Sequence, residues 1–295
     1  MKHSFKGIFT ALTTPFIQGN ISPEKFKENI QKYNAFDLSG YVVCGSSGES
    51  VYLMDEESEK LVQTAKETAS SEKKIIVGTA RESTKITLEF TNRMAAFNID
   101  AALIRTPSYF KSKMDYEALK KHYLTIADNS KVPVIIYNIP QYTGVSVDHQ
   151  LIVRLSSHPN IVGIKDSSGN LTFVSELIPK VPPDFSILLG AGSIILSGLI
   201  MGASGGILRL ADVAPAKCAE LYKLFLEGKM DQARRLQLEL VPLNKAIIQT
   251  FGISGCKYAL DLLGYFGGLP RLPLLPLDEK GKEEIKNILN NLSLL

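Results

Sequence analysis

Short apolar runs rich in β-branched residues alternate along the chain with longer segments of helical period. The apolar runs predict eight strands, at residues 7–12, 40–43, 74–77, 101–104, 133–137, 161–165, 185–189 and 205–208. Amphipathic segments between them predict helices, among them residues 23–34, 57–69, 84–97 and 116–129. Because the runs are apolar at nearly every position, we expect a parallel sheet covered on both sides.

Eight strand-helix units predict an α/β fold of the closed (β/α)8 TIM-barrel type. A doubly wound sheet is the structural alternative, but no G-x-G-x-x-G motif opens the first helix. Residues 1–225 are expected to form the catalytic barrel and residues 226–295 a C-terminal helical extension. The extension shows helical patterns at 231–250 and 255–263, a proline-rich stretch at 269–276 and a last helix near 280–291.

Composition fits a single large core. The chain has 295 residues, of which 45% are hydrophobic and 21% charged, and this excludes disorder and coiled coil. Its 33 basic and 30 acidic residues are scattered along the chain, so we expect a small-molecule substrate and neither nucleic acid nor a membrane as partner.

The cysteines and histidines encode no local site. Neither a disulfide framework nor a zinc motif is visible in the spacing of Cys44, Cys218, Cys256, His3, His122, His149 and His158. The first residues lack the apolar run of a signal peptide, and the longest apolar stretch is too short to span a bilayer. A cytoplasmic protein without a metal is therefore expected.

Active sites of parallel barrels lie at the carboxyl ends of the strands. The second predicted strand leads into Gly45-Ser46-Ser47-Gly48-Glu49-Ser50. Its glycines free backbone N–H groups and its serines add hydroxyls, which suits an anion such as a carboxylate. The alternative is an ordinary glycine-rich turn.

Two neighbouring strands end in chemically useful side chains. The fifth carries Tyr137 to the barrel mouth, where a phenol can transfer protons, although a half-buried structural aromatic is the alternative. The sixth places Lys165 at the end of an apolar strand, and such burial lowers the pKa of a lysine amine and frees it as a nucleophile. Taken alone, Lys165 is better explained as a lysine that reaches solvent or pairs with an acid. Tyr137 and Lys165, together with residues 45–50 (the serine loop), favour imine chemistry on a 2-oxo acid. That chemistry needs no metal or other cofactor.

Over essentially its full length, the chain resembles the dihydrodipicolinate synthase and N-acetylneuraminate lyase family of pyruvate-dependent class I aldolases. The resemblance rests on four motifs in the family's order and spacing: Thr13-Thr-Pro-Phe16, Gly45-Ser-Ser-Gly-Glu49, Tyr137-Asn-Ile-Pro140 with Thr143-Gly144, and Gly163-Ile-Lys165-Asp166. It implies a barrel with a helical extension, assembled as a homotetramer of two tight dimers.

The resemblance also implies roles for individual residues. Lys165 would be the Schiff-base lysine, Tyr137 the proton donor and acceptor, and Ser46 the relay hydroxyl. Tyr109 would match a tyrosine that reaches in from the adjacent subunit. The remaining positions would bind substrate: the N–H groups of Ser46 and Ser47, the carbonyl of Ile207, and the entrance residues Thr143 and Gly144.

Departures from the synthase pattern favour 4-hydroxy-2-oxoglutarate aldolase, which yields pyruvate and glyoxylate. Tyr142 stands where the synthase has an arginine for its second substrate. Segments 82–84, 158–167, 251–253 and 264–268 look most like the 4-hydroxy-2-oxoglutarate aldolases, whereas residues 190–193 lack the acidic pair of the neuraminate lyases. Arg209 could approach a distal carboxylate, or simply pair with Asp212 at the rim. Asp55, Glu82 and Ile86 do not match the lysine-effector pocket, so lysine feedback is not expected.

Several alternatives remain. Within the family they are 4-hydroxy-tetrahydrodipicolinate synthase, which condenses pyruvate with aspartate semialdehyde, and a 2-keto-3-deoxy sugar acid aldolase. A phosphate-binding barrel isomerase would use Gly190–Gly192 and Gly205-Gly206, but it offers Lys165 no role. A non-catalytic 2-oxo acid-binding barrel is the alternative from a different class.

Overall fold

The computed structural model describes residues 4–295. Eight parallel strands form a closed barrel in the order β1-β10-β9-β8-β7-β6-β5-β4. They are β1 (Gly7–Ala11), β4 (Gly40–Val43), β5 (Lys74–Gly78), β6 (Ala101–Arg105), β7 (Val134–Asn138), β8 (Ile161–Asp166), β9 (Ser186–Leu189) and β10 (Gly205–Leu208). Each agrees with a predicted strand to within one residue at either end. The predicted (β/α)8 barrel with C-terminal helices is confirmed.

Residue contacts divide the chain into two units. The first unit consists of Ile76–Ile207 and the N-terminal segment that ends at Gly7. The second unit consists of Ile8–Ile75 and Leu208–Leu295. The division into a barrel of residues 1–225 and an extension of residues 226–295 remains a prediction.

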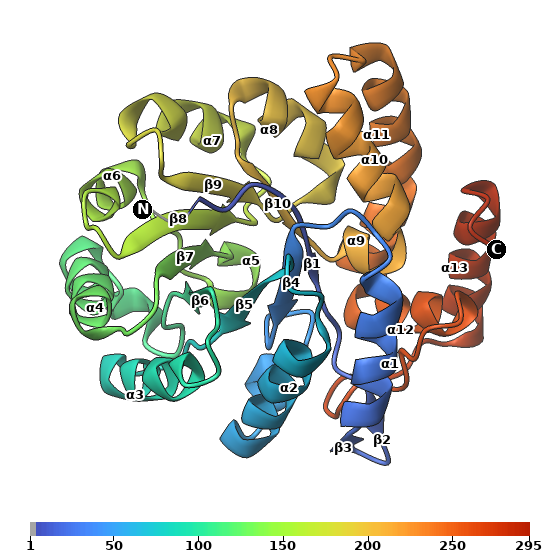
Figure 1. Cartoon of the computed structure of the whole chain (residues 1–295), viewed down its shortest axis with the longest axis horizontal. Helices are drawn as coiled ribbons and strands as arrows, with labels where there is room; N and C mark the ends of the chain where they lie inside the picture. The colour runs from blue at the N-terminus through green and yellow to red at the C-terminus, as the bar shows by residue number, and fades with distance from the viewer. Residues whose placement is uncertain (1–3) are drawn as a thin grey trace. The chain divides into compact units, whose positions relative to one another are not determined.

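In the first unit, helices lie along the outer side of the strands (Figure 1). They are α3 (Thr84–Ala95), α4 (Tyr116–Asn129), α6 (His149–Ser156), α7 (Leu171–Leu177) and α8 (Ile195–Met201), with the short α5 (Pro140–Thr143) directly after β7. The side chains of Ser83, Asp115 and Asp148 cap α3, α4 and α6 by accepting hydrogen bonds from first-turn N–H groups. Strand β7 is buried at every position, as expected for a parallel strand covered on both faces.

The second unit combines β1 and β4 with α1 (Pro23–Tyr33), α2 (Asp55–Thr68) and the C-terminal helices. The latter are α9 (Leu210–Val213), α10 (Pro215–Leu226), α11 (Met230–Lys245), α12 (Gly252–Leu262) and α13 (Glu279–Asn291). Helix α10 packs along α11, and α13 contacts both α11 and α12 (Figure 1).

Two local features of the second unit differ from the sequence prediction. Strands β2 (Phe16–Ile17) and β3 (Asn20–Ile21) form a small antiparallel hairpin. Its turn residues Gln18 and Gly19 have φ angles of 51° and 80°, and positive φ at both positions is the geometry of a type I′ turn. The helix predicted over 231–250 stops being α-helical at Lys245, and Ala246–Thr250 continue as a π-helical turn.

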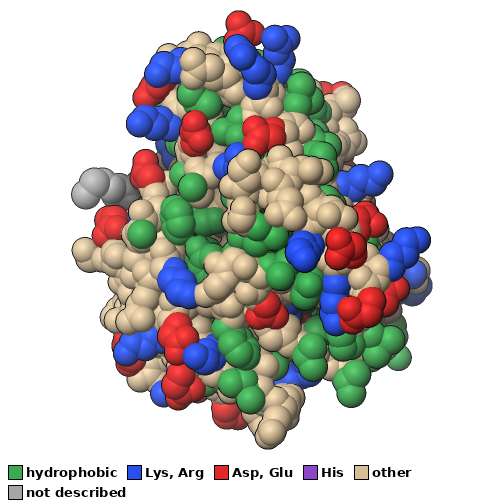
Figure 2. All heavy atoms as spheres, turned by 90° about the vertical axis from the view of Figure 1, so that its right-hand side faces the viewer, with side chains coloured by type: hydrophobic (Ala, Val, Ile, Leu, Met, Phe, Trp, Pro, Cys, Tyr) green, Lys and Arg blue, Asp and Glu red, His purple; other side chains and the backbone are tan. Residues whose placement is uncertain are grey.

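The surface is mixed in charge. On the face in Figure 2, basic and acidic side chains are interspersed among apolar and neutral ones. In residues 4–295, no helix is both long enough and apolar enough to cross a membrane.

Candidate active site

The first unit brings Lys165 and Tyr137 together. The two residues are register partners on the adjacent strands β8 and β7, one position before each strand ends. Lys165 Nζ lies 4.2 Å from the centroid of the Tyr137 ring. Both side chains are buried, with 5% of each residue exposed. A lysine amine and a phenol are therefore held side by side, as the sequence predicts.

Asn138 and Asp166, the next residues of the two strands, are joined by a hydrogen bond that the sequence analysis missed. Asn138 Nδ2 donates to Asp166 Oδ1 over 2.6 Å, and Ser168 Oγ donates to Oδ2 over 2.7 Å. Burial raises the pKa of Asp166, and the bonds from Ser168 and Asn138 offset part of that increase. The signal was present, because Asn138 and Asp166 directly follow Tyr137 and Lys165 in the sequence. This bond joins the ends of β7 and β8 beside Tyr137 and Lys165.

Glycine is required where β9 ends. Gly190 N donates to Asp166 O over 2.6 Å, and a Cβ on Gly190 would lie 1.8 Å from Ser167 Oγ. Any side chain at this position would push away the segment that follows Lys165. Ile207, whose carbonyl is predicted to face the site, lies in β10 and is almost completely buried.

The segment that carries Tyr109 is anchored by Glu82. Its carboxylate accepts hydrogen bonds from the N–H groups of Ser108 and Tyr109, over 2.8 and 2.9 Å, and pairs with Arg105 over 2.9 Å. Burial raises the pKa of Glu82, but the bonds from Tyr109 and Ser108 and the Arg105 charge outweigh it and lower the pKa to about 2. Tyr109 and Phe110 are 80% and 68% exposed and contact each other edge to face. The backbone is fixed while the aromatic side chains point outward, and the contact of Tyr109 with an adjacent subunit stays a prediction.

Thr143 is the last residue of α5 and Gly144 is its C-cap. The Thr143 hydroxyl contacts Ile139 O and the backbone of Val145 at 3.0–3.2 Å, and Gly144 adopts a left-handed φ of 65°. Thr143 is buried, whereas the preceding Tyr142 is 57% exposed. The hydroxyl of Thr143 therefore serves the turn, and its direct role toward substrate stays a prediction.

In the second unit, the serine loop is tightly wound. Cys44 and Glu49, at its two ends, have positive φ angles of 53° and 55°. Glu49 N donates to Ser46 O, and Thr14 Oγ1 donates to Gly48 O over 2.7 Å. A Cβ on Gly48 would lie 3.1 Å from Leu12 O, so glycine permits the close approach.

The loop is joined to the C-terminal helices by charged side chains. Glu49 Oε1 lies 2.7 Å from Lys257 Nζ, in an ion pair with both side chains fully buried, although Oε1 makes no hydrogen bond of ordinary geometry. Glu49 Oε2 accepts from Arg271 N over 2.8 Å, and the Arg271 guanidinium pairs with Glu57 over 2.6 Å. The sequence analysis missed this network because no local pattern links residues so far apart.

Arg209 also contacts the loop. Its Nε donates to Ser47 Oγ over 3.0 Å and its Nη1 to Ile247 O over 2.9 Å, while only 6% of the residue is exposed. Arg209 forms no ion pair with Asp212, the alternative that the sequence offered, although its charge lowers the pKa of that carboxyl. Asp212 Oδ2 instead accepts from Thr13 N over 3.1 Å.

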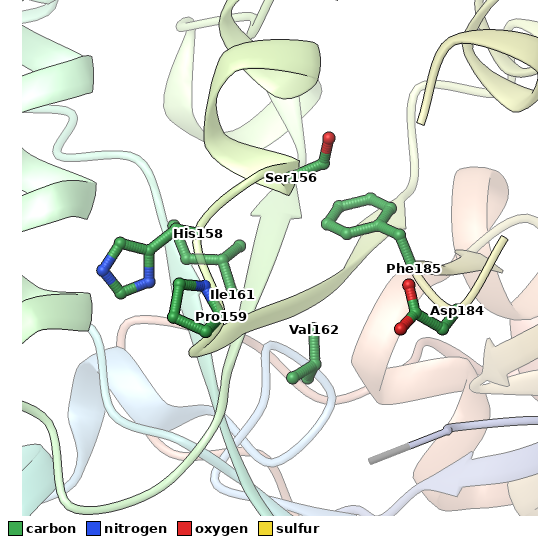
Figure 3. A pocket seen from close by; sticks show the side chains of 7 residues that line it. All are labelled: Ser156, His158, Pro159, Ile161, Val162, Asp184 and Phe185. Atoms are coloured by element: carbon green, nitrogen blue, oxygen red, sulfur yellow. The ribbon is translucent and has the colours of Figure 1, made fainter. Parts of the chain in front are cut away.

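A small cavity lies at the other end of β8 (Figure 3). Its volume is about 10 Å³, room for about one water molecule. The lining side chains are Ser156, His158, Pro159, Ile161, Val162, Asp184 and Phe185. Because Ile161 begins β8 and Lys165 lies near its carboxyl end, this cavity is separate from the candidate site. Among residues 4–295, no cluster of three or more His, Cys, Asp or Glu is arranged to hold a metal ion, and His3 lies outside the described residues.

Comparison with known proteins gives one consistent family. The sequence model of the dihydrodipicolinate synthetase family matches residues 4–292. The chain is 33% identical to a 4-hydroxy-tetrahydrodipicolinate synthase of Methanothrix thermoacetophila, with 98% of this chain and 97% of the relative covered. It is 34% identical to the enzyme of that name from Thermodesulfovibrio yellowstonii, with 99% of both covered.

Solved structures agree. The dihydrodipicolinate synthase of Aquifex aeolicus superposes with a TM-score of 0.93 at 31% identity, covering 98% of this chain and 99% of that one. The dihydrodipicolinate synthase of Thermotoga maritima superposes with a TM-score of 0.95 at 29% identity, covering 99% of this chain and 100% of that one.

Proposed function

Since the chain belongs to the dihydrodipicolinate synthetase family, whose sequence model matches residues 4–292, we propose that it binds pyruvate as an imine on Lys165. It is a carbon-carbon lyase of the class I aldolase type. The observation that carries the proposal is the buried pair of Lys165 Nζ and the Tyr137 ring, 4.2 Å from nitrogen to ring centroid.

The proposed reaction begins when the neutral Lys165 amine attacks the ketone carbon of pyruvate. Water leaves, and the protonated imine withdraws electrons from the neighbouring methyl carbon. That carbon loses a proton to form an enamine, which attacks an aldehyde carbon and forms the new C–C bond. Hydrolysis of the imine releases the product and regenerates the amine; cleavage follows the same steps in reverse. Tyr137 is proposed to transfer the protons, since its ring lies beside Nζ.

The remaining site residues have proposed supporting roles. The Ser46 and Ser47 N–H groups would bind the substrate carboxylate, with the Ser46 hydroxyl and a partner subunit's Tyr109 in the proton relay. Ile207, Thr143 and Gly144 would border the substrate. A tight loop with left-handed residues at both ends supports the first role, because such backbone presents N–H groups to anions. A cytoplasmic homotetramer is proposed on the same resemblance.

The second substrate separates two candidates. The relatives are named 4-hydroxy-tetrahydrodipicolinate synthase, which favours aspartate semialdehyde, and they do not support the 4-hydroxy-2-oxoglutarate aldolase predicted from sequence motifs. We therefore propose aspartate semialdehyde first. Glyoxylate is the second candidate because Tyr142 occupies the place of the synthase arginine.

Borohydride trapping tests the function. The parent chain incubated with pyruvate and borohydride should gain the mass of one reduced pyruvoyl group, mapped by peptide analysis to Lys165. Lys165→Ala should gain none while remaining folded. No gain in the folded parent would refute the proposal. Product formation with pyruvate plus each aldehyde, and cleavage of 4-hydroxy-2-oxoglutarate, then distinguish the two candidates.

A further inference from the structure

Arg209 is a buried cation whose hydrogen bonds go only to uncharged oxygens. Nε donates to the Ser47 hydroxyl and Nη1 to the carbonyl of Ile247, and only 6% of the residue is exposed. All three residues belong to the second unit. Burying a charge is unfavourable unless an opposite charge compensates it.

In the part of the chain that the structure describes, no carboxylate forms an ion pair with Arg209. The other buried cations of the second unit each have a carboxylate partner, Lys257 with Glu49 at 2.7 Å and Lys73 with Glu72 at 3.5 Å. Arg209 has none among residues 4–295. Asp212 is the nearest acid in the sequence, and the Arg209 charge lowers its pKa, but the two form no ion pair: Asp212 accepts from Thr13 N, and burial still holds its pKa at about 7.

The position of the guanidinium indicates where an anion would compensate it. Ser47 accepts from Arg209 Nε, so its own O–H is available to donate to a ligand. A hydroxyl that accepts from a cation becomes a stronger donor, because hydrogen bonds in a chain polarise one another. A carboxylate at the N–H groups of the same loop would also lie next to the positive charge.

We propose that Arg209 is a positioning residue for the carboxylate of the 2-oxo acid, acting through Ser47. This inference rests on the proposed function and deepens it. The buried charge makes the loop select anionic 2-oxo acids over uncharged carbonyl compounds of the same shape. It replaces the sequence-based hypothesis that Arg209 binds the distal carboxylate.

Imine trapping at varied ligand concentration tests the proposal. The probes are pyruvate and pyruvamide, its uncharged amide, and the measured quantity is the concentration that gives half-maximal labelling of Lys165. For Arg209→Gln this concentration should rise by about 10- to 100-fold for pyruvate, the usual effect of losing a hydrogen-bonded charge. For pyruvamide it should change less than about twofold, and Arg209→Lys should recover part of the loss.

The controls separate charge from folding. Arg234→Gln removes a charge of the same sign from an exposed site, where Arg234 pairs with Asp231, and should leave both probes unchanged. If Arg209→Gln does not fold, Arg209→Lys and Ser47→Ala test the proposal instead. Each should raise the half-maximal labelling concentration more for pyruvate than for pyruvamide.

Three outcomes would overturn the inference, and they are distinguishable. An equal rise for both probes would assign Arg209 a purely structural role. A rise only in the aldehyde KM would assign it to the second substrate. Labelling of the parent with no change in any variant would leave the proposed function standing and remove Arg209 from it, whereas an unlabelled parent would refute the function itself.

Discussion

Asn138 and Asp166 are joined by a 2.6 Å hydrogen bond that crosses from β7 to β8, one residue beyond Tyr137 and Lys165. The bond ties together the strand ends that carry the phenol and the amine. Ser168 bonds the same carboxylate but belongs to the segment after β8, so it does not bridge the two strands.

The rate of imine formation should depend on this cross-strand bond. Asn138→Ala should slow pyruvate trapping by at least about tenfold, because small misplacements of reacting groups strongly reduce rates. Ser168→Ala, which removes the other hydrogen bond to Asp166, should slow it less than about threefold. The measurement is the labelling rate at saturating pyruvate, with circular dichroism to verify folding. Equal rates in the two variants would contradict a role for strand alignment.

The buried pair of Glu49 and Lys257 should contribute strongly to stability. Lys257→Met leaves the Glu49 carboxylate buried without its cation, and we expect the free energy of unfolding to fall by about 3–5 kcal/mol. Lys217→Met is the matched control, because Lys217 pairs with Glu239 at the same 2.7 Å distance but on a partly exposed surface. It should cost less than about 1 kcal/mol.

Urea unfolding of both variants and of a double variant checks this prediction. Combining Glu49→Gln with Lys257→Met removes the unpaired charge, so the double variant should be more stable than Lys257→Met alone. A Lys257→Met loss no larger than that of Lys217→Met would show that the pair is not important for stability.

The strands and the reactive pair were predictable because the information is local. Apolar runs with abrupt ends define each strand, and barrel geometry places consecutive strand ends such as those of Tyr137 and Lys165 side by side. The β2–β3 hairpin was missed because strands of two residues show no periodicity.

The charged contacts were not predictable for a different reason. The bonds of Ser47 with Arg209 and of Glu49 with Lys257 join residues from opposite ends of the chain, and the pattern within either segment does not specify its partner. For Arg209, surface-charge statistics favoured a pair with Asp212. In the structure both residues are buried, and the guanidinium donates to Ser47 of the loop.

The Tyr109 segment should loosen when Glu82 loses its charge. Glu82→Gln removes the ion pair with Arg105 and one of the two carboxylate oxygens that serve residues 108 and 109. We expect amide hydrogen exchange of Ser108 and Tyr109 to accelerate by about tenfold or more, and activity to fall with little change in overall stability. Glu89→Gln on α3 is the control, since Glu89 forms only an exposed pair with Lys85. Unchanged exchange in Glu82→Gln would show that the segment is held by other contacts.

Asp212 should make the protein less stable as pH rises toward neutrality. Burial raises its pKa from 3.8 to about 7. Between these values the folded state keeps a proton that the unfolded state has lost, so the stabilisation is complete below pH 3.8 and is lost as pH rises to about 7. The full change is on the order of 4 kcal/mol, at 1.36 kcal/mol for each pH unit.

His122 contributes with the opposite sign, so the parent profile alone does not isolate Asp212. Burial lowers the pKa of His122 from 6.5 to about 4, and the folded state therefore gains stability as pH rises between these values. Asp166, whose pKa burial also raises, adds a loss with the sign of Asp212. The His122 and Asp166 contributions are common to the parent and Asp212→Asn, so the difference in unfolding free energy between the two isolates Asp212, and the parent should lose stability relative to the variant as pH rises from 4 to 7. Urea titrations at half-unit pH steps give both profiles, and parallel curves between pH 4 and 7 would show that Asp212 does not titrate in this range.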